Sequence, residues 1–149
     1  MAESFDCIVI GSGPGGYVTA IRAAQLGMKT AVVEKDTVGG RCLNYACIPA
    51  KAVLRTADIL TEVDEAAEFG IDVPGRTVDF GKVSERRRKV IRTLTGGVAG
   101  LFKKNGVEYV EGVATLTGGK GVKVGDRELE ATRCVVLATG SVPLSLIHI

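Results

Sequence analysis

The sequence predicts an α/β fold, in which helices cover a mostly parallel sheet and a small antiparallel meander follows. Three observations support this. Two apolar segments flank a helical segment within residues 5–34, a glycine-rich loop joins the first of them to the helix, and short strands separated by glycine turns follow residue 107. Strands that alternate with helices favour a parallel sheet, whereas closely spaced short strands favour antiparallel pairing.

The N-terminal segment is predicted to form a β-α-β unit. Residues 5–10 are a short apolar run that stops at Gly11, which is typical of a buried strand. Residues 14–27 follow a helical period and end at Gly27, and residues 29–34 form a second buried strand. Such a unit is almost always right-handed, so its strands are parallel.

Two long helices are predicted next. The first covers about residues 47–68 and ends at Gly70, and the second covers about residues 84–105 with Ser84 as its N-cap. Gly96 and Gly97 lie inside the second helix, where each costs about 1 kcal/mol relative to alanine. We therefore expect this glycine pair to pack closely against another part of the molecule.

The remaining residues predict short strands. The meander over residues 113–130 has a hairpin turn at Gly118-Gly119, and a separate buried strand at 133–138 ends before Thr139. The strands are expected at residues 107–111, 113–117, 121–124 and 127–130.

The composition fits one ordinary globular domain. The chain has 149 residues, 46% hydrophobic and 24% charged, and its net charge of +2 gives no reason to expect nucleic-acid binding. No apolar run reaches the 18 residues of a membrane span, and the N-terminus lacks the basic region of a signal peptide. We therefore expect a cytoplasmic protein without membrane contact. In that reducing compartment its four cysteines are catalytic, metal-binding or plain buried thiols.

The glycine-rich loop matches the pattern G-x-G-x-x-G, and Glu34 closes the next strand 18 residues after Gly16. This context is typical of a Rossmann-like site for a dinucleotide. Gly11 permits a tight turn, Gly13 lets the backbone approach a pyrophosphate, and Gly16 allows close packing of helix and strand. Glu34 is placed to accept hydrogen bonds from a ribose diol. The pattern does not separate NAD from FAD, and a glycine turn without a ligand is the alternative.

Cys42 and Cys47 lie five residues apart at the start of a predicted helix. Five helical residues rise about 7.5 Å, beyond the usual 4.4–6.8 Å between the Cα atoms of a disulfide. A bond therefore needs a distorted first turn, which we attribute to Pro49. A strained disulfide is easily reduced and suits a catalytic couple, and Arg41 and Lys51 would favour a thiolate.

Two other interpretations of these cysteines stay open. A metal site needs four ligands, and the chain offers no second closely spaced cysteine pair and only one histidine, His148. Two unrelated buried thiols are the other possibility. Cys7 and Cys134 lie inside apolar strands and are predicted to be core residues.

Three segments together resemble the flavin-dependent pyridine nucleotide–disulfide oxidoreductases. They are the loop at residues 11–16, the segment 39–51 and the segment 138–143, and the resemblance covers about residues 5–143. Leu43-Asn44, Ile48-Pro49 and residues 94–104 are most similar to the members that oxidise dihydrolipoamide with NAD⁺.

The resemblance implies a bound FAD, with NAD⁺ as the co-substrate. Cys42 would form a mixed disulfide with dihydrolipoamide, and Cys47 would lie against the flavin. The cofactor-binding residues implied are Gly11, Ser12, Gly13, Pro14, Gly15, Gly16, Glu34, Lys35, Gly40, Arg41, Cys42, Lys51, Ala114, Thr139, Gly140 and Ser141. The implied partners are dihydrolipoamide or lipoyl domains of 2-oxoacid dehydrogenase or glycine-cleavage complexes, and the longer parent is expected to be a homodimer.

Two alternatives to this function remain. One is another flavin disulfide reductase, acting on mercuric ion or glutathione. The other is a nucleotide-binding module without turnover.

The sequence also departs from the family pattern. Ala46 and Ala50 replace the usual glycine and serine, and we expect both changes to tune the redox couple without removing it. Family members continue through an NAD⁺ domain, a return strand and an interface domain that supplies a His–Glu base. We therefore expect residues 1–143 to be an incomplete FAD-binding domain, inactive alone, and residues 144–149 to be a tail of doubtful origin. We do not expect His148 to be that base, and the basic run at residues 86–89 is interpreted as a solvated face.

Overall fold

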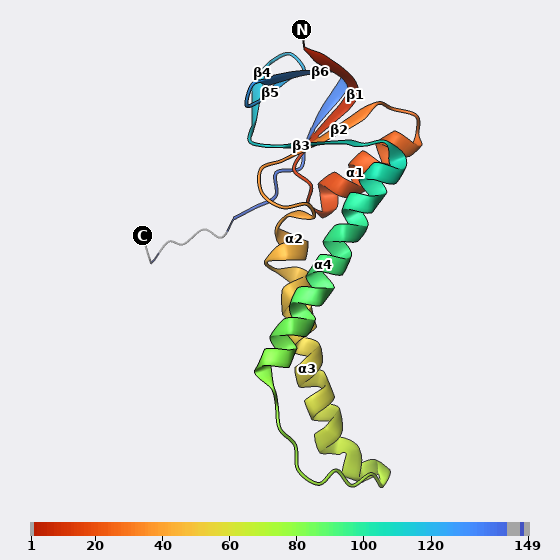
Figure 1. Ribbon diagram of the computed structural model, residues 1–149, viewed down its shortest axis with the longest axis vertical. Coiled ribbons are helices and arrows are strands. Elements are labelled where there is room, and N and C mark those ends of the chain that lie inside the picture. The colour runs from red at the N-terminus through yellow and green to blue at the C-terminus, as the bar shows by residue number, and fades with distance from the viewer. Residues whose placement is uncertain (1, 143–146, 148–149) are drawn as a thin grey trace.

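The computed structural model describes residues 2–142 and residue 147. The predicted tail at residues 144–149, apart from Ile147, lies outside the described residues, as does His148. Within the described part, a six-stranded sheet lies at one end and two long helices extend from it (Figure 1).

The sheet has the order β3-β2-β1-β6-β5-β4. Its parallel part consists of β3 (Glu108–Glu111), β2 (Thr30–Glu34), β1 (Glu3–Ile10) and β6 (Arg127–Leu137). β5 (Gly121–Val124) and β4 (Ala114–Gly118) add to β6 as an antiparallel meander. The predicted α/β class, the parallel β-α-β unit and the meander are therefore confirmed.

One strand differs from the prediction. Residues 127–130 and 133–138 were expected as two strands, but β6 is continuous from Arg127 to Leu137. Its first part pairs with β5, while β1 pairs with it along nearly its whole length. A register shift between β1 and β6 absorbs the irregularity that breaks the apolar pattern around Thr132.

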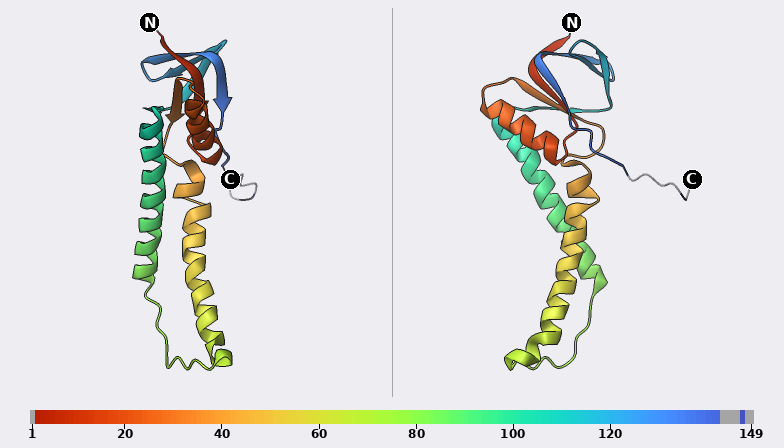
Figure 2. Two further views of the ribbon diagram at one scale, coloured as in Figure 1. Left: turned by 90° about the vertical axis from the view of Figure 1, so that its right-hand side faces the viewer. Right: turned by 180° about the vertical axis from the view of Figure 1, so that it is seen from behind.

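One face of the sheet is covered by helices. α1 (Pro14–Gln25) packs on β1 and β2, and α4 (Phe80–Asn105) crosses α1 near the sheet (Figure 2). The buried cluster on this side joins strand and helix residues, namely Cys7, Val9, Ala20, Ala23, Val32, Leu43, Val98, Phe102 and Val107. Gly27, with φ +84°, follows the end of α1 as predicted.

The opposite face has its own buried cluster. Phe5 and Ile8 of β1 and Val33 of β2 pack with Val122 of β5 and Leu129 of β6. The meander therefore does more than extend the sheet, because its side chains complete the second half of the core.

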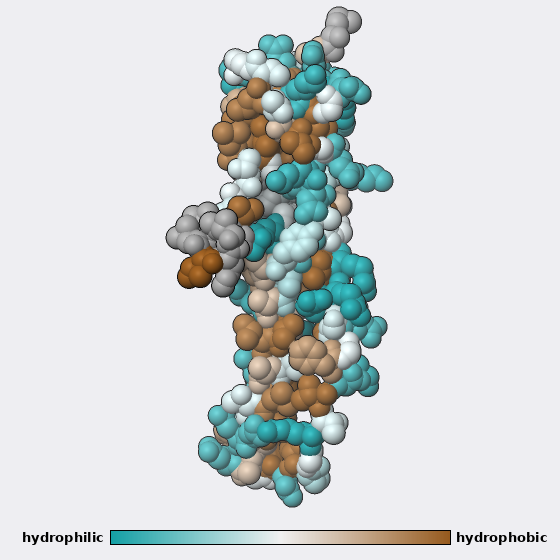
Figure 3. Space-filling view, turned by 90° about the vertical axis from the view of Figure 1, so that its left-hand side faces the viewer, coloured by the Kyte–Doolittle hydropathy of each residue, from teal (hydrophilic) through white to brown (hydrophobic). Residues whose placement is uncertain are grey.

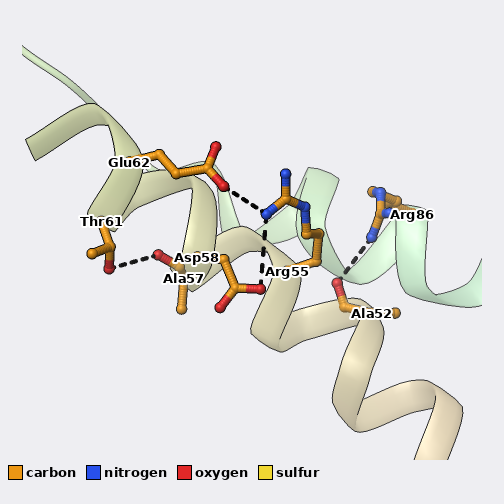
Figure 4. Close-up of polar contacts among 7 residues, drawn as sticks. All are labelled: Ala52, Arg55, Ala57, Asp58, Thr61, Glu62 and Arg86. Atoms are coloured by element: carbon orange, nitrogen blue, oxygen red, sulfur yellow. Dashed lines mark hydrogen bonds and ion pairs between the residues drawn. The ribbon is translucent and has the colours of Figure 1, made fainter. Parts of the chain in front are cut away.

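Two helices form a long hairpin that projects away from the sheet (Figures 1 and 2). α3 (Cys47–Glu65) continues into a 3₁₀ turn, η1 (Ala66–Phe69), and Gly70 follows with φ +74°, as predicted. Arg86 of α4 donates a hydrogen bond to the Ala52 carbonyl of α3 at 2.9 Å, and Arg55 pairs with Glu62 along α3 (Figure 4). The basic run at residues 86–89 is thus not only a solvated face, since Arg86 links the two helices.

Two expectations for α4 are wrong. The helix begins one turn earlier than predicted, because the Asp79 carboxylate, and not Ser84, accepts the capping hydrogen bond, from the Lys82 backbone N–H at 3.1 Å. A Cβ atom built on Gly96 or Gly97 meets nothing within 4 Å. The glycine pair therefore does not pack closely in this chain.

The far end of the hairpin keeps apolar side chains at the surface. Phe69 and Phe80 are 79% and 70% exposed, and apolar surface is visible over this end of the molecule in Figure 3. Despite this, none of the helices in the described residues is both long and apolar enough to cross a membrane.

Candidate functional site

The glycine-rich loop connects β1 to α1 at the carboxyl edge of the parallel strands. Gly11 has φ +99°, and a Cβ atom there would lie 2.3 Å from the Ala138 carbonyl oxygen. A Cβ atom on Gly16 would lie 1.8 Å from the Gly11 carbonyl oxygen. Side chains at these two positions would force β1, α1 and the end of β6 apart, as the sequence predicted for a tight turn and close packing.

Gly13 has a different surrounding. A Cβ atom on Gly13 would meet nothing within 4 Å, so the space on that side of its backbone is open at the start of α1. Pro14 occupies the first helical position, where its missing N–H costs nothing, and no side chain caps the helix. The free N–H groups and partial positive charge of a 12-residue helix are therefore open to an anionic group.

The Glu34 carboxylate accepts hydrogen bonds from the glycine-rich loop. The Ser12 backbone N–H and hydroxyl donate to Glu34 Oε2 at 2.8 and 2.7 Å, and the Asp36 N–H donates to Oε1 at 3.1 Å. Ser12 is fully buried and Glu34 is 7% exposed. A buried carboxylate needs such donors, and the arrangement fixes its orientation at the end of β2.

A cleft of about 500 Å³ lies beside these residues. This volume is in the range of small-molecule sites, which is roughly 300–1,000 Å³. Predicted site residues from five separate segments line it, namely Gly11, Gly13, Glu34, Lys35, Gly40, Arg41, Ala114, Thr139, Gly140 and Ser141.

Other predicted residues lie outside the lining of the cleft. Ser12 and Gly16 are buried beneath it, Pro14 and Gly15 are exposed in the first turn of α1, and Lys51 is exposed on α3. The structure adds lining residues that the sequence analysis missed, among them Asp36, Tyr45 and Gly112. The only signal for Gly112 in the sequence was its place between two predicted strands. Gly112 has φ +144°, and its N–H donates a hydrogen bond to the Glu34 carbonyl at 2.8 Å.

The two neighbouring cysteines lie on different helices. Cys42 is in the short helix α2 (Gly40–Asn44), which the sequence analysis missed, and Cys47 is the first residue of α3. The helical path breaks at Tyr45 and Ala46, and Ala46 has φ −124° and ψ −92°. The predicted distortion is present, but Pro49 lies in the first turn of α3, where proline is tolerated.

The Cys42 and Cys47 thiols are both free and contact each other. A hydrogen bond between them is the largest cause that raises the pKa of Cys42, burial adds to it, and the positive charge of Lys51 opposes it. The expected effect of Lys51 in favour of a Cys42 thiolate is therefore present, but the neighbouring thiol and burial outweigh it in this reduced state. The two thiols therefore lie next to each other where the helical path breaks.

The helix α2 ties the thiols to the cleft. A Cβ atom on Gly40 would lie 2.7 Å from Gly13 Cα, so α2 begins directly against the glycine loop. The Gly39 N–H donates to Ser12 Oγ at 3.2 Å, and the Asn44 amide donates to the Gly40 carbonyl at 2.9 Å. Gly40 and Arg41 line the cleft and Cys42 follows them at once.

A family model described as pyridine nucleotide-disulphide oxidoreductase matches residues 5–149. The chain belongs to this family. Family membership implies FAD and NAD as the cofactors of the group.

Individual members of the family are also similar over nearly the whole chain. A dihydrolipoyl dehydrogenase of Bacillus subtilis is 47% identical over 144 residues, and one of Chlamydia trachomatis is 42% identical over 145 residues. These alignments cover 95% and 96% of this chain. The chain spans about a third of the length of these relatives, since the matched part is 31% of each.

The residues present fit the nucleotide of this oxidoreductase family. The open backbone at Gly13 leaves room for a phosphate, and the fixed Glu34 carboxylate offers acceptors to a diol. The thiol pair begins one residue beyond the cleft lining.

The prediction for the other two cysteines is half right. Cys7 is buried, as expected for a core thiol, but Cys134 is exposed. Cys134 lies opposite Cys7 on β6, whereas α1 packs on β1 and β2, so the helix layer leaves this part of β6 uncovered.

Proposed function

We propose that the chain supplies the FAD-binding and redox-active part of a dihydrolipoyl dehydrogenase. Residues 1–143 would form the first part of the FAD-binding domain, with residues 144–149 outside it. The observation that carries the proposal is the contact between the Cys42 and Cys47 thiols, because Cys42 lies in α2 directly after Gly40 and Arg41, which line the cleft. A plain nucleotide-binding module has no need of this second feature.

The residues of the cleft have distinct roles in this proposal. The N–H groups at the start of α1 and the backbone of Gly13 would receive the pyrophosphate of FAD, and Glu34 would accept the hydroxyl groups of its adenosine ribose. Lys35, Ala114 and residues 139–141 line the remainder of the cleft and would exclude water from the cofactor. When bound, FAD supplies the two-electron acceptor that passes electrons from the dithiol to NAD⁺.

The two cysteines would divide the sulfur chemistry. In the oxidised state they would form a disulfide, and a thiolate of dihydrolipoamide would attack Cys42, form a mixed disulfide and release Cys47 as a thiolate. The second substrate thiol would then displace Cys42, so that lipoamide leaves oxidised and both cysteines are left reduced. The free, contacting thiols of this structure correspond to that reduced state.

The proposal includes the surroundings that the sequence predicted. The substrate would be free dihydrolipoamide or a lipoyl domain of a 2-oxoacid dehydrogenase or glycine-cleavage complex, and the enzyme would act in the cytoplasm as a homodimer. The 149 residues alone would bind nucleotide without turnover.

Activity assays test the proposal. A longer protein that contains this chain should reduce NAD⁺ with dihydrolipoamide, and Cys42→Ser or Cys47→Ser should abolish turnover while the flavin stays bound. Cys134→Ser, which changes a thiol outside the cleft, is the matched control and should keep the activity under reducing conditions. Turnover only with mercuric ion or glutathione disulfide would replace the proposed substrate.

Binding assays test the part of the proposal that concerns the chain itself. ADP or FAD should bind to the isolated 149 residues in a calorimetric titration, and lipoamide turnover should be absent. Lack of nucleotide binding by a folded chain would overturn the assignment of the cleft.

A further inference from the structure

Cys7 and Cys134 lie opposite each other on the adjacent parallel strands β1 and β6. This juxtaposition depends on the register shift between the strands. Phe5 pairs with Ala131, and without the shift that follows, Arg133 would lie opposite Cys7.

Asp6 holds the shifted segment in place. Its carboxylate accepts hydrogen bonds from the Lys29 backbone N–H and from the Thr132 hydroxyl, both at 2.9 Å, and lies 3.7 Å from Arg133 Nε. The side chains of Thr132 and Arg133, the two residues before Cys134, are thus both directed to Asp6. The register shift and the contacts of Asp6 therefore place Cys7 opposite Cys134.

The distance between neighbouring strands suits a disulfide. Adjacent strands lie about 4.7–4.9 Å apart, inside the usual 4.4–6.8 Å between the Cα atoms of bonded cysteines. Burial is the largest cause that raises the pKa of Cys7 to about 11, and a hydrogen bond with the Cys134 thiol adds to it. The side chains therefore point to the same side of the sheet and meet there.

The two thiols differ in access to solvent. Cys7 is 2% exposed and lies in the cluster beneath α1, whereas Cys134 is exposed. A reagent in solution reaches Cys134 first, and Cys7 is positioned behind it to displace whatever group Cys134 has acquired.

We propose that Cys7 and Cys134 form a second dithiol, separate from Cys42 and Cys47, that closes to a disulfide by exchange with a low-molecular-weight disulfide. The Cys134 thiolate attacks one sulfur of glutathione disulfide, forms a mixed disulfide and releases one glutathione thiolate. The Cys7 sulfur, on losing its proton, then attacks Cys134 Sγ and releases the second glutathione. Two protein thiols are oxidised and one glutathione disulfide is reduced to two glutathione molecules.

The Cys7–Cys134 dithiol lies outside the cleft, but on the two strands that lead to it. Ile10 and Leu137 pair three residues beyond the cysteines, and the Ala138 N–H donates to the Ile10 carbonyl at 2.8 Å just before the glycine loop. A disulfide would join the two strands whose ends carry Gly11 and Thr139.

Mass spectrometry of the full chain with Cys42→Ser and Cys47→Ser tests the proposal, because only these two thiols remain. After incubation with glutathione disulfide we expect the loss of two hydrogens, a Cys7–Cys134 cross-linked peptide and no retained glutathione. Adding Cys7→Ser should leave one glutathionyl group on Cys134, and adding Cys134→Ser should leave Cys7 unmodified. Glutathione retained on Cys134 with Cys7 present, two separate adducts, or no reaction would each overturn the proposal.

A second measurement on the unmodified chain avoids dependence on variants that fail to fold. Phenylarsine oxide condenses with two neighbouring thiols, forming two As–S bonds and releasing water. We expect arsenic-bridged peptides that contain residues 7 and 134, besides those that contain residues 42 and 47. A map with only the second bridge would overturn the proposal, and neither result depends on flavin binding or turnover.

Discussion

Ser12 binds Glu34 twice, through its backbone N–H at 2.8 Å and through its hydroxyl at 2.7 Å, and both hydrogen bonds end on the same carboxylate oxygen. The hydroxyl also accepts a hydrogen bond from the Gly39 N–H at 3.2 Å. One buried serine therefore joins the glycine loop, the end of β2 and the entry to α2. Three of the segments that line the cleft therefore share a single polar junction.

Replacing this serine should destabilise the fold and weaken nucleotide binding. Ser12→Ala leaves a buried carboxylate without one donor and the Gly39 N–H without its acceptor, which costs about 1–3 kcal/mol. Urea unfolding measures the first effect and ADP titration the second. Ser4→Ala, at an exposed position of β1, should change stability by less than about 0.5 kcal/mol. Equal effects of both variants would contradict the role of the junction.

Adding a methyl group to two different glycines should have opposite effects. Gly16→Ala places Cβ against the Gly11 carbonyl oxygen, a backbone atom that cannot move without shifting β1, so we expect a loss of about 2–3 kcal/mol. Gly97→Ala meets nothing within 4 Å in an exposed helix interior and should stabilise the chain by about 1 kcal/mol. Unfolding in urea gives both values. A destabilising Gly97→Ala would show that this position is covered after all.

The contact between Cys42 and Cys47 should be visible in thiol reactivity. Cys47→Ala removes the largest cause of the raised pKa of Cys42, so the thiolate fraction should rise and alkylation should move to lower pH. Lys51→Met removes a positive charge that lowers this pKa and should move alkylation to higher pH. Below its pKa a thiol reacts in proportion to its thiolate fraction, so at neutral pH we expect faster alkylation of Cys42 in Cys47→Ala and slower alkylation in Lys51→Met.

Alkylation by iodoacetamide, followed residue by residue with mass spectrometry across pH, measures these shifts. Lys82→Met is the matched control, because Lys82 lies in the first turn of α4 beside the N-cap residue Asp79 and is not among the charges that act on Cys42. Its profile for Cys42 should equal that of the parent chain. Identical profiles for Cys47→Ala and the parent would contradict the thiol contact.

Local sequence patterns predicted most of this fold. They did not predict the features that depend on contacts between residues far apart in the sequence. Periodicity and positive φ are local properties. The apolar runs of β1 and β2 and the spacing of the glycines could therefore be interpreted without knowledge of the tertiary contacts. Exposure of Cys134 and the open surroundings of Gly97 depend on which elements cover them, which no local pattern contains. Similarly, α2 is too short for a periodic signal, and β6 stays continuous only because β1 shifts its register beside it.

The site divides in the same way. The tight turn and close packing of the glycine loop and the place of Glu34 at the end of β2 were predictable, because they follow from local features of the sequence. The carboxylate's buried partner Ser12 was named only as part of the loop, since its bond to Glu34 spans 22 residues. The raised pKa of Cys42 was missed because it follows from the neighbouring thiol and burial, which outweigh the charge of Lys51.

The ion pair that joins the starts of β1 and β6 should make stability depend on pH. Arg127 donates to both carboxylate oxygens of Glu3, at 2.8 and 2.7 Å, and also pairs with Glu108 of β3 at 3.2 Å. These hydrogen bonds lower the pKa of Glu3 below its ordinary value of 4.5. A carboxylate with a lowered folded pKa contributes stability above its unfolded pKa and loses that contribution as pH falls through the folded value. Glu3→Gln should therefore lower the urea midpoint at pH 7, and its difference from the parent chain should shrink below about pH 4.5.

Glu128→Gln is the matched control, because Glu128 is exposed on the same strand as Arg127 and forms no ion pair within residues 2–142. A constant difference between Glu3→Gln and the parent from pH 7 to pH 3 would show that the ion pair does not contribute to folding.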